Sequence, residues 1–392
     1  MSAKIWEQID LHNGSDVSKE LDEYEDIIKK LYNGEIHPER FRSYRLLFGT
    51  YGVRHQGEGI HMLRIKVPSG FITSEQLRTI ADVVEKYAGS GHGHLTTRQD
   101  IQLHFVKLLD VPPLLKELAK TGLTTREACG NTVRNVTASH LSGICPDEIF
   151  DPLPYALYTT RYFLRHPLTS TLPRKFKIAF SECEDDHAMV KIHDLGCVSQ
   201  IRKNGKDIYG FKVYVAGGLG AIPFYAKPIA DFVPVDEFYP LAEAIIRIFH
   251  EYGAEERKNR NKARIKFLVA RIGFDRFKEL VIAEFERIKR LKPLKEDLER
   301  YVESFPQPAP AKNGREDGEE NAKRLKSPVH LPNPNDELYK LFLHKYTFRQ
   351  KQDGYFGAYM KPPIGNLKPD EFRFIAELSE LYGAGYVRIT PR

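Results

Sequence analysis

The sequence predicts an α+β protein in which two copies of one strand–helix unit flank an inserted α/β domain. The first observation is an internal repeat, because five residues near the start recur near the end at a constant offset. The second is a central region that mixes strand and helix patterns. The third is a segment rich in Pro, Ala, Asn, Glu and Lys before the second copy. The matching pairs are Pro68 and Pro363, Gly70 and Gly365, Ile80 and Ile375, Ala81 and Ala376, and Tyr87 and Tyr382.

These observations divide the 392 residues into five parts. The parts are a helical lead-in (1–40), a first repeat (41–125), a central domain (126–305), a flexible linker (306–330) and a second repeat (331–392). Such a repeat predicts pseudo-twofold symmetry, with a site between the copies. In the first repeat Arg98 leads into a further strand, whereas the second repeat stops at its matching arginine, Arg392. We therefore expect an incomplete second repeat, as in a fragment or one half of a split protein.

Local patterns place elements in the lead-in and the first repeat. Residues 17–32 form the best helical window of the lead-in, and alternating apolar and basic residues over 62–68 predict a half-buried strand. Thr73 and Gln76 fit a capping box at the start of a helix. A second, short helix is expected over 112–121. The apolar face of the capped helix is formed by Leu77, Ile80, Ala81, Val84 and Tyr87. In the next strand Ile101, Leu103 and Phe105 alternate with Gln102 and His104.

In the central domain, alternation predicts strands over 176–180 and 210–216, and amphipathic patterns predict helices over 241–252 and 275–290. Residues 217–220 are glycine-rich and follow a strand, but they do not fit the GxGxxG pattern, which argues against a Rossmann site.

The composition is that of a globular protein with a modest positive charge. Hydrophobic residues make up 41% and charged residues 29%, and the formal net charge is +6. No apolar run approaches membrane-spanning length, and residues 1–20 lack the apolar core of a signal peptide, so a cytoplasmic location is the default expectation. The densest basic run, 257–266, fits a solvated helix face, a nucleic-acid patch or a group that serves a polyanionic cofactor, and we favour the third.

A stretch of small residues around one arginine points to a bound anion. Residues 128–138 hold Arg134 among Ala, Gly, Asn, Thr and Val, and similar residues continue towards Asp151. A core element would carry more Leu, Ile and Val. Small residues beside a cation let the backbone approach something large and anionic, which we interpret as a cofactor.

Four stretches carry cations that do not resemble an ordinary surface. They contain Arg64 with Lys66, Arg98, Arg134, and Lys175 with Lys177. In a strand, Lys175 and Lys177 project from the same face. A small oxyanion held away from water needs several such donors, and the same groups can organise water for proton delivery. Each cation alone fits a solvated side chain, whereas their joint presence favours an anion site.

The histidines and cysteines give weaker signals. His92, His94 and His104 fit either metal ligands or polar loop and strand positions, and we favour the second interpretation. The cysteines lack CxxC spacing, so we expect buried thiols and assign no residue to a metal site. The four cysteines are Cys129, Cys145, Cys183 and Cys197.

In their order, these motifs resemble the sirohaem- and 4Fe–4S-dependent sulfite and nitrite reductases. The resemblance runs from about Phe41 to Arg392. It implies two ferredoxin-like half-domain repeats that flank a sirohaem-binding α/β domain, with the second repeat incomplete. The motifs that carry it are Leu95-Thr96-Thr97-Arg98-Gln99, Gly130-Asn131-Thr132-Val133-Arg134-Asn135-Val136-Thr137, Arg174-Lys175-Phe176-Lys177, Gly217-Gly218-Leu219-Gly220 and Val387-Arg388-Ile389-Thr390-Pro391-Arg392.

The resemblance also implies roles for individual residues. In that family two arginines and two lysines surround the substrate anion on sirohaem iron, and other cations and amides hold the sirohaem carboxylates. Some relatives have arginine where this chain has His94, which would make one carboxylate contact pH-sensitive. By motif, the catalytic residues are Arg64, Arg134, Lys175 and Lys177, and the cofactor-binding residues are Thr96, Arg98, Gln102 and Arg174.

The family binds its 4Fe–4S cluster through C-x5-C and C-x3-C pairs, a spacing that none of the four cysteines here has. The resemblance therefore implies cluster ligands outside this chain, and we expect it to be inactive until a second polypeptide or further residues supply them.

The implied reaction is six-electron reduction of sulfite to sulfide, or alternatively of nitrite to ammonia, with ferredoxin or a flavoprotein as electron donor. A non-catalytic sirohaem-binding protein is the alternative from another class. We expect neither a nucleic-acid nor a membrane partner.

Overall fold

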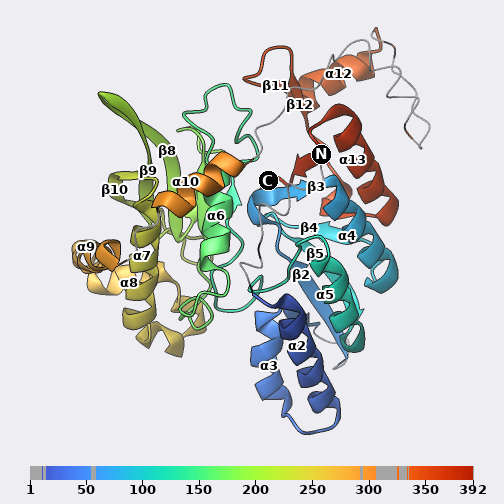
Figure 1. Cartoon of the computed structure of the whole chain (residues 1–392), viewed down its shortest axis with the longest axis horizontal. Helices are drawn as coiled ribbons and strands as arrows, with labels where there is room; N and C mark the ends of the chain where they lie inside the picture. Colours follow the sequence, from blue (N-terminus) through green and yellow to red (C-terminus); the bar gives the residue numbers. More distant parts are fainter. Residues whose placement is uncertain are drawn as a thin grey trace.

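The structure, a computed structural model, describes residues 11, 15–53, 59–291, 295–305, 325, 333 and 335–391. The predicted linker, apart from Leu325, and Arg392 lie outside these residues. Figure 1 shows two lobes side by side, one built from both repeats and the other from the central part of the chain. None of the described helices has the length and apolar character needed to cross a bilayer.

The lead-in and the first repeat form most of one lobe. The predicted helix over 17–32 is confirmed, and so is the capping box, in which Thr73 Oγ1 accepts from the amide of Gln76 and Gln76 Oε1 accepts from the amide of Thr73. The elements are α2 (Val17–Tyr32), α3 (Pro38–Leu47), β1 (Thr50–Gly52), β2 (Ile60–Ile65), β3 (Phe71–Thr73), α4 (Ser74–Tyr87), β4 (Gly93–Leu95), β5 (Ile101–Lys107) and α5 (Val111–Ala119).

The predicted strand over Ile101 to Phe105 is present, but the alternation breaks at Phe105. Its side chain is 41% exposed, whereas Val106 is buried. Between the pairs Leu63–Leu103 and His61–Val106, strand β5 has one residue more than β2, and Phe105 has a φ of 58°. This bulge moves the following side chain to the opposite face of the sheet.

The second repeat completes the same lobe. Its strands pair with those of the first repeat reciprocally, because β13 is antiparallel to β4 and β14 is antiparallel to β3. The result includes a five-stranded antiparallel sheet in the order β1-β2-β5-β4-β13. The elements are α12 (Glu337–Tyr346), β11 (Thr347–Arg349), β12 (Phe356–Ala358), β13 (Asn366–Leu367), α13 (Pro369–Tyr382) and β14 (Tyr386–Arg388).

Side-chain contacts between α4 and α13 follow the same symmetry. Arg78 donates to both carboxylate oxygens of Glu380, at 2.7 and 2.6 Å, and Arg373 Nη2 donates to Glu85 Oε2 at 2.5 Å. Arg373 and Glu380 are the counterparts of Arg78 and Glu85 at the offset of the repeat. The internal repeat and its pseudo-twofold arrangement are therefore confirmed.

The central lobe is a mixed sheet in the order β10-β9-β8-β7-β6, covered by helices. Strands β6, β7 and β8 are parallel, and β9 and β10 are antiparallel. Strands and helices lie in all four predicted stretches. The elements are β6 (Thr137–Ala138), α6 (Leu153–Phe163), β7 (Ile178–Ser181), β8 (Leu195–Asn204), β9 (Lys206–Val215), β10 (Lys227–Pro234), α7 (Phe238–Tyr252), α8 (Ile265–Ile272), α9 (Phe274–Leu291) and α10 (Lys295–Ser304).

Gln99 fixes the loop between β4 and β5 to both the central lobe and the second repeat. Its Nε2 donates to the carbonyls of Ala138 and Ile389, at 2.9 and 2.7 Å, and its Oε1 accepts from the amide of Ala138 at 3.1 Å. The side chain is fully buried, and an unmade bond there would be costly. This loop carries Thr96 and Arg98, so its anchoring positions them at the boundary between the lobes.

Candidate anion-binding site

A cavity of about 310 Å³ lies between residues of the first repeat and of the central lobe. Six of the eight predicted site residues line it, whereas Gln102 and Arg174 do not. The lining residues are Tyr51, Met62, Arg64, Thr96, Thr97, Arg98, Arg134, Lys175 and Lys177.

Gln102 acts on the cavity through Arg64. The two residues are paired across β2 and β5. With its amide nitrogen donating to His104 Nε2, Gln102 presents its oxygen to Arg64, at 2.6 Å from Nη2 and 3.0 Å from Nε. The bidentate contact holds the guanidinium plane of Arg64 in place. Gln102 is therefore placed as a positioning residue rather than as part of the lining.

The small-residue stretch supplies carbonyl groups to the two arginines. Arg134 Nη1 donates to the carbonyl of Ala128 at 2.7 Å and its Nε to that of Gly130 at 3.1 Å. Arg64 Nη1 reaches the same Ala128 carbonyl at 3.4 Å. The carbonyl oxygens accept hydrogen bonds from some N–H groups of each guanidinium but do not neutralise its charge. The positive charge therefore stays available to a bound anion.

Arg98 is held by two further carbonyls. Its Nε donates to Asn135 at 3.1 Å and its Nη2 to Ile178 at 3.0 Å. Burial lowers the pKa of Arg98 to about 9. Thr96 Oγ1 accepts from the backbone amides of Arg98 and Asp100, which closes the turn that precedes β5.

Lys175 and Lys177 flank the fully buried Phe176 and both line the cavity. The amide of Phe176 donates to the carbonyl of Thr132, and its own carbonyl accepts from the amide of Arg134. Burial, with Arg98 and Arg264 nearby, lowers the pKa of Lys177 to about 7. Burial and neighbouring arginines lower that of Lys175 to about 8. Both ammonium groups are thus charged at a cost that an anion would relieve.

Arg174 lies beside this segment but outside the lining. It is half-buried, and burial together with the charge of Arg260 lowers its pKa. The predicted contact of Arg174 with a cofactor therefore stays a prediction.

Asp100 was not predicted as a site residue. Its carboxylate is buried, neither oxygen accepts a hydrogen bond from the described residues, and Oδ2 lies 4.0 Å from Arg64 Nε. Burial raises the pKa of Asp100 to about 6 although Arg64 and Lys66 oppose the shift. The sequence feature that could have identified Asp100 is its position directly after the Leu95–Gln99 motif.

Arg264 and Lys266 belong to the basic run over 257–266 and do not line the cavity. Arg264 nevertheless supports the backbone of the lining residue Lys177 through Asp194. Arg264 donates to both oxygens of the buried Asp194, at 3.0 and 2.7 Å, and Asp194 also accepts from the amide of Lys177 at 2.9 Å. Lys266 Nζ donates to the carbonyl of Gly218 at 3.1 Å. A Cβ on Gly218 would lie 2.9 Å from the guanidinium of Arg264, which explains glycine there.

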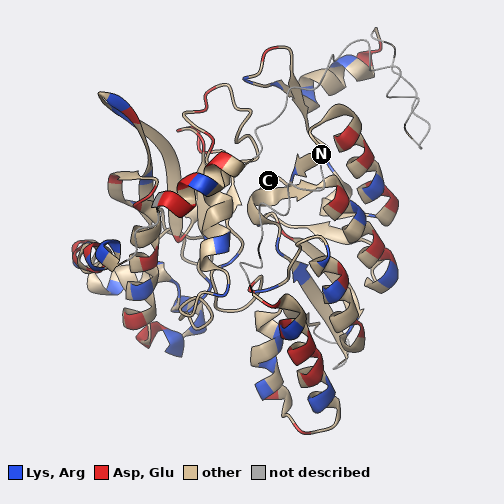
Figure 2. Cartoon of the chain, in the orientation of Figure 1, with Lys and Arg blue, Asp and Glu red and all other residues tan. Residues whose placement is uncertain are grey.

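The charge of the lining differs from that of the outer surface. Figure 2 shows acidic and basic residues mixed along the helices α2, α4 and α13. The cavity, by contrast, is lined by five cationic side chains and no carboxylate. Such a one-signed cavity concentrates anions.

The polar interpretation of the histidines agrees with their contacts. His92 Nδ1 lies 2.8 Å from the carbonyl of Ser90, and His94 Nδ1 lies 2.8 Å from Asn366 Oδ1, between the paired strands β4 and β13.

Four converging cysteines are not found within the described ranges. Cys129 Sγ contacts the carbonyl of Gly49 at 3.6 Å, and Cys197 is buried in β8. Cys145 and Cys183, however, lie together. The described thiols therefore do not form the four-cysteine set of a 4Fe–4S cluster.

Comparisons with known proteins agree with this architecture. The family model described as "Nitrite and sulphite reductase 4Fe-4S domain" matches residues 129–289. The model described as "Nitrite/Sulfite reductase ferredoxin-like half domain" matches residues 53–121 and again 348–392. The second model thus recognises both repeats.

Individual relatives are similar over much of the chain. A ferredoxin–nitrite reductase of Leptolyngbya laminosa is 30% identical over 370 residues, 91% of this chain and 62% of that protein. The protein named sulfite reductase (ferredoxin) 1 of Mycolicibacterium paratuberculosis is 32% identical over 253 residues, 64% of this chain and 42% of that protein. The chain thus spans only part of the length of these relatives.

The solved structure of the Mycobacterium tuberculosis NirA protein has the same fold, with a TM-score of 0.70 over 95% of this chain and 64% of that chain, at 24% identity. Two family models, two repeats and a shared fold lead to one conclusion. The chain belongs to the nitrite and sulfite reductase family.

Proposed function

We propose that this chain binds sirohaem and a small oxyanion in the cationic cavity, as part of a reductase that carries out the six-electron reduction of sulfite to sulfide. The observation that carries the proposal is the convergence of Arg64, Arg134, Lys175 and Lys177 on one cavity whose lining contains no carboxylate. An anion in this cavity would receive charge-assisted hydrogen bonds from both arginine and lysine donors.

Lys177 is suited to exchange protons as well as to hold charge. Reduction of sulfite or nitrite consumes protons, and a donor works best when its pKa lies near the working pH. Burial and neighbouring cations lower the pKa of Lys177 to about 7. We assign to Lys177 Nζ the delivery of protons to the bound anion, and to the two arginines its orientation.

The charge of the cavity lining supports the binding of sirohaem, a polyanion with eight carboxylates. Five cationic side chains line the cavity, and the nearby buried carboxylates of Asp100 and Asp194 lie outside the lining. When bound, sirohaem supplies a redox-active iron to which the substrate anion can coordinate. Thr96 and Arg98 would hold its carboxylates, and Gln102 would act by fixing Arg64.

The iron–sulfur cofactor belongs to the family, but the described cysteines do not form a set that fits it. We therefore assign no cluster ligand and no electron-transfer step to these residues. Relatives are named for ferredoxin, and we propose ferredoxin as the electron donor.

Nitrite is the second candidate substrate. The relatives that cover most of the chain, from Leptolyngbya laminosa and Arabidopsis thaliana, are named ferredoxin–nitrite reductases. In favour of sulfite, its dianion carries twice the charge of nitrite, and a cavity lined by five cations favours the more highly charged anion.

The test compares variants in the organism that makes this protein, so that every natural partner is present. The K175M/K177M double variant should lose sulfite reduction by roughly 100-fold or more in extracts supplied with a reduced viologen, because donors to a reacting anion are worth that much. Lys206→Met, at the exposed start of β9, is the matched control and should keep full activity. Unchanged reduction of both sulfite and nitrite in the double variant would contradict the proposal.

A further inference from the structure

A second group of chemically active side chains lies at the other end of the strands that carry the cationic cavity. Arg134 and Lys177 precede the parallel strands β6 and β7, whereas Cys145 follows β6 and Glu182 and Cys183 directly follow β7. The four residues of β7 span about 13 Å, so the two groups are separate sites.

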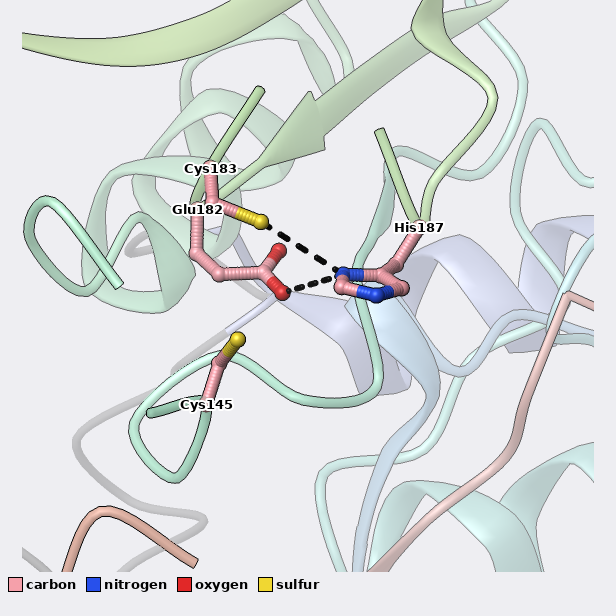
Figure 3. A group of neighbouring side chains, drawn as sticks. All are labelled: Cys145, Glu182, Cys183 and His187. Carbon is pink, nitrogen blue, oxygen red and sulfur yellow. Dashed lines mark hydrogen bonds and ion pairs between the residues drawn. The ribbon is translucent and has the colours of Figure 1, made fainter. Parts of the chain in front are cut away.

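This group consists of Cys145, Glu182, Cys183 and His187, and their potential ligand atoms all lie within 4.8 Å of one another. Figure 3 shows the four side chains pointing toward one another from two loops. His187 Nδ1 lies 3.6 Å from Cys183 Sγ and 2.9 Å from Glu182 Oε1. Cys145, Cys183 and Glu182 are buried, and His187 is partly exposed at one side.

The two separations that involve His187 Nδ1 fit one tetrahedral ion. With Zn–S of about 2.3 Å and Zn–N of about 2.0 Å, a tetrahedral angle puts sulfur and nitrogen about 3.5 Å apart. The observed separation of Cys183 Sγ and His187 Nδ1 is 3.6 Å. Glu182 and His187 would open by only about 0.4 Å to reach the nitrogen–oxygen spacing of the same geometry.

We propose that Cys145, Glu182, Cys183 and His187 bind one zinc ion as a closed, four-coordinate structural site. Two thiolates and an imidazole select zinc over magnesium or calcium, which prefer oxygen ligands. Four protein ligands leave no open position for a substrate, so the ion stabilises rather than catalyses. A four-iron cube would hold its ligand atoms further apart than the observed 4.8 Å spread permits.

A buried carboxylate without a cation would be poorly stabilised here. Glu182 is fully buried in the loop after β7, and Ser181 Oγ lies 3.4 Å from its Oε2. A buried charge requires a strong partner, and a divalent ion shared with two thiolates supplies one.

The ion would stabilise the docking of the second repeat on the central lobe. The loop over 141–148, which carries Cys145, holds the β11–β12 hairpin through three bonds. The carbonyl of Ile144 accepts from the amide of Lys351 at 2.9 Å, the carbonyl of Gly143 accepts from Gln352 Nε2 at 2.8 Å, and Glu148 Oε1 accepts from Lys351 Nζ at 2.6 Å. Phe348 of β11 packs beside Cys145 and Cys183.

The test measures metal in the purified full chain. We expect one zinc per chain by elemental analysis, counted separately from iron. After removal of zinc, cobalt should give the thiolate charge-transfer and intense visible bands of a tetrahedral site. The C145A/C183A variant should lose both the zinc and these bands. Cys197→Ala, which changes a buried thiol outside the group, should retain them.

The wild-type measurements need no variant to fold and can overturn the proposal alone. A chain that holds no zinc and gives no tetrahedral cobalt spectrum would exclude the site. So would a Cys145–Cys183 disulfide in the native protein, or equal zinc in the double variant and the Cys197→Ala control.

Discussion

Individual cations of the cavity are held in a state that favours anion binding. Carbonyl groups orient Arg64, Arg98 and Arg134, but none of these contacts removes charge. The pKa of each lysine is lowered, mainly by burial, to about 8 for Lys175 and about 7 for Lys177. An anion that enters would raise both values, so binding takes up protons.

This leads to a prediction for pH. A lysine with a lowered pKa is charged below that value and neutral above it, so the affinity for nitrite, which stays a monoanion across this range, should be highest below about pH 7 and fall as the pH rises through about 7 to 8. Each lost charge should weaken binding roughly tenfold. Calorimetric titration of the chain with nitrite across this range measures the change. Lys177→Arg, which stays charged, should move the fall to higher pH, and an affinity independent of pH would contradict the assignment.

At this scale the sequence revealed residue types better than contacts. Arg64, Arg134, Lys175 and Lys177 could be named because each lies in a recognisable motif. The support of Arg64 by Gln102 depends on the pairing of β2 with β5, and a buried Asp100 depends on how the lobes close. Neither the contact of Gln102 with Arg64 nor the burial of Asp100 can be predicted from the spacing of nearby residues.

Among the elements, α4 shows how local sequence fixes a helix at the boundary of the repeats. Thr73 and Gln76 bond each other's backbone, and Gln76 Nε2 also donates to the carbonyl of Thr121 at 3.0 Å. The same residue, Thr73, ends β3, which pairs with β14 of the second repeat. One cap therefore joins the start of a helix to the contact between repeats.

We predict that Thr73→Ala lowers the free energy of unfolding by about 1–2 kcal/mol, because a buried cap is lost and the amide of Gln76 is left without its partner. Thr73→Ser keeps the hydroxyl and should recover most of this loss. Urea denaturation followed by circular dichroism compares the two variants. Equal midpoints for the alanine and serine variants would show that the cap contributes nothing.

Secondary structure could be predicted where the hydrophobic residues follow a regular period, and the prediction failed where that period is interrupted. The helix over 17–32 and the cap at Thr73 follow from patterns within one segment. The bulge at Phe105 can be recognised only from the pairing of β5 with β2. The approach of Cys145 to Cys183 likewise requires the parallel pairing of β6 and β7, so thiols that looked unrelated in sequence lie in one cluster.

For the whole molecule, a symmetric scaffold carries an asymmetric site. The strand pairs β3–β14 and β4–β13 and the Arg78 and Arg373 contacts repeat across the pseudo-twofold axis. The repeat counterpart of Arg64, however, is Tyr359, whose hydroxyl lies 2.7 Å from His140 Nε2. The first repeat thus contributes a cation to the cavity, whereas the second uses the same position to contact the central lobe.

The most direct test of the central claim is an absorption titration of the purified chain with sirohaem, followed by sulfite at about pH 7. The account predicts saturation at one sirohaem per chain and a spectral change when sulfite is added. It also predicts that the K175M/K177M variant binds sirohaem but shows little of the sulfite change. No saturable binding of sirohaem, or an unaltered sulfite response in the double variant, would contradict the assignment of this cavity.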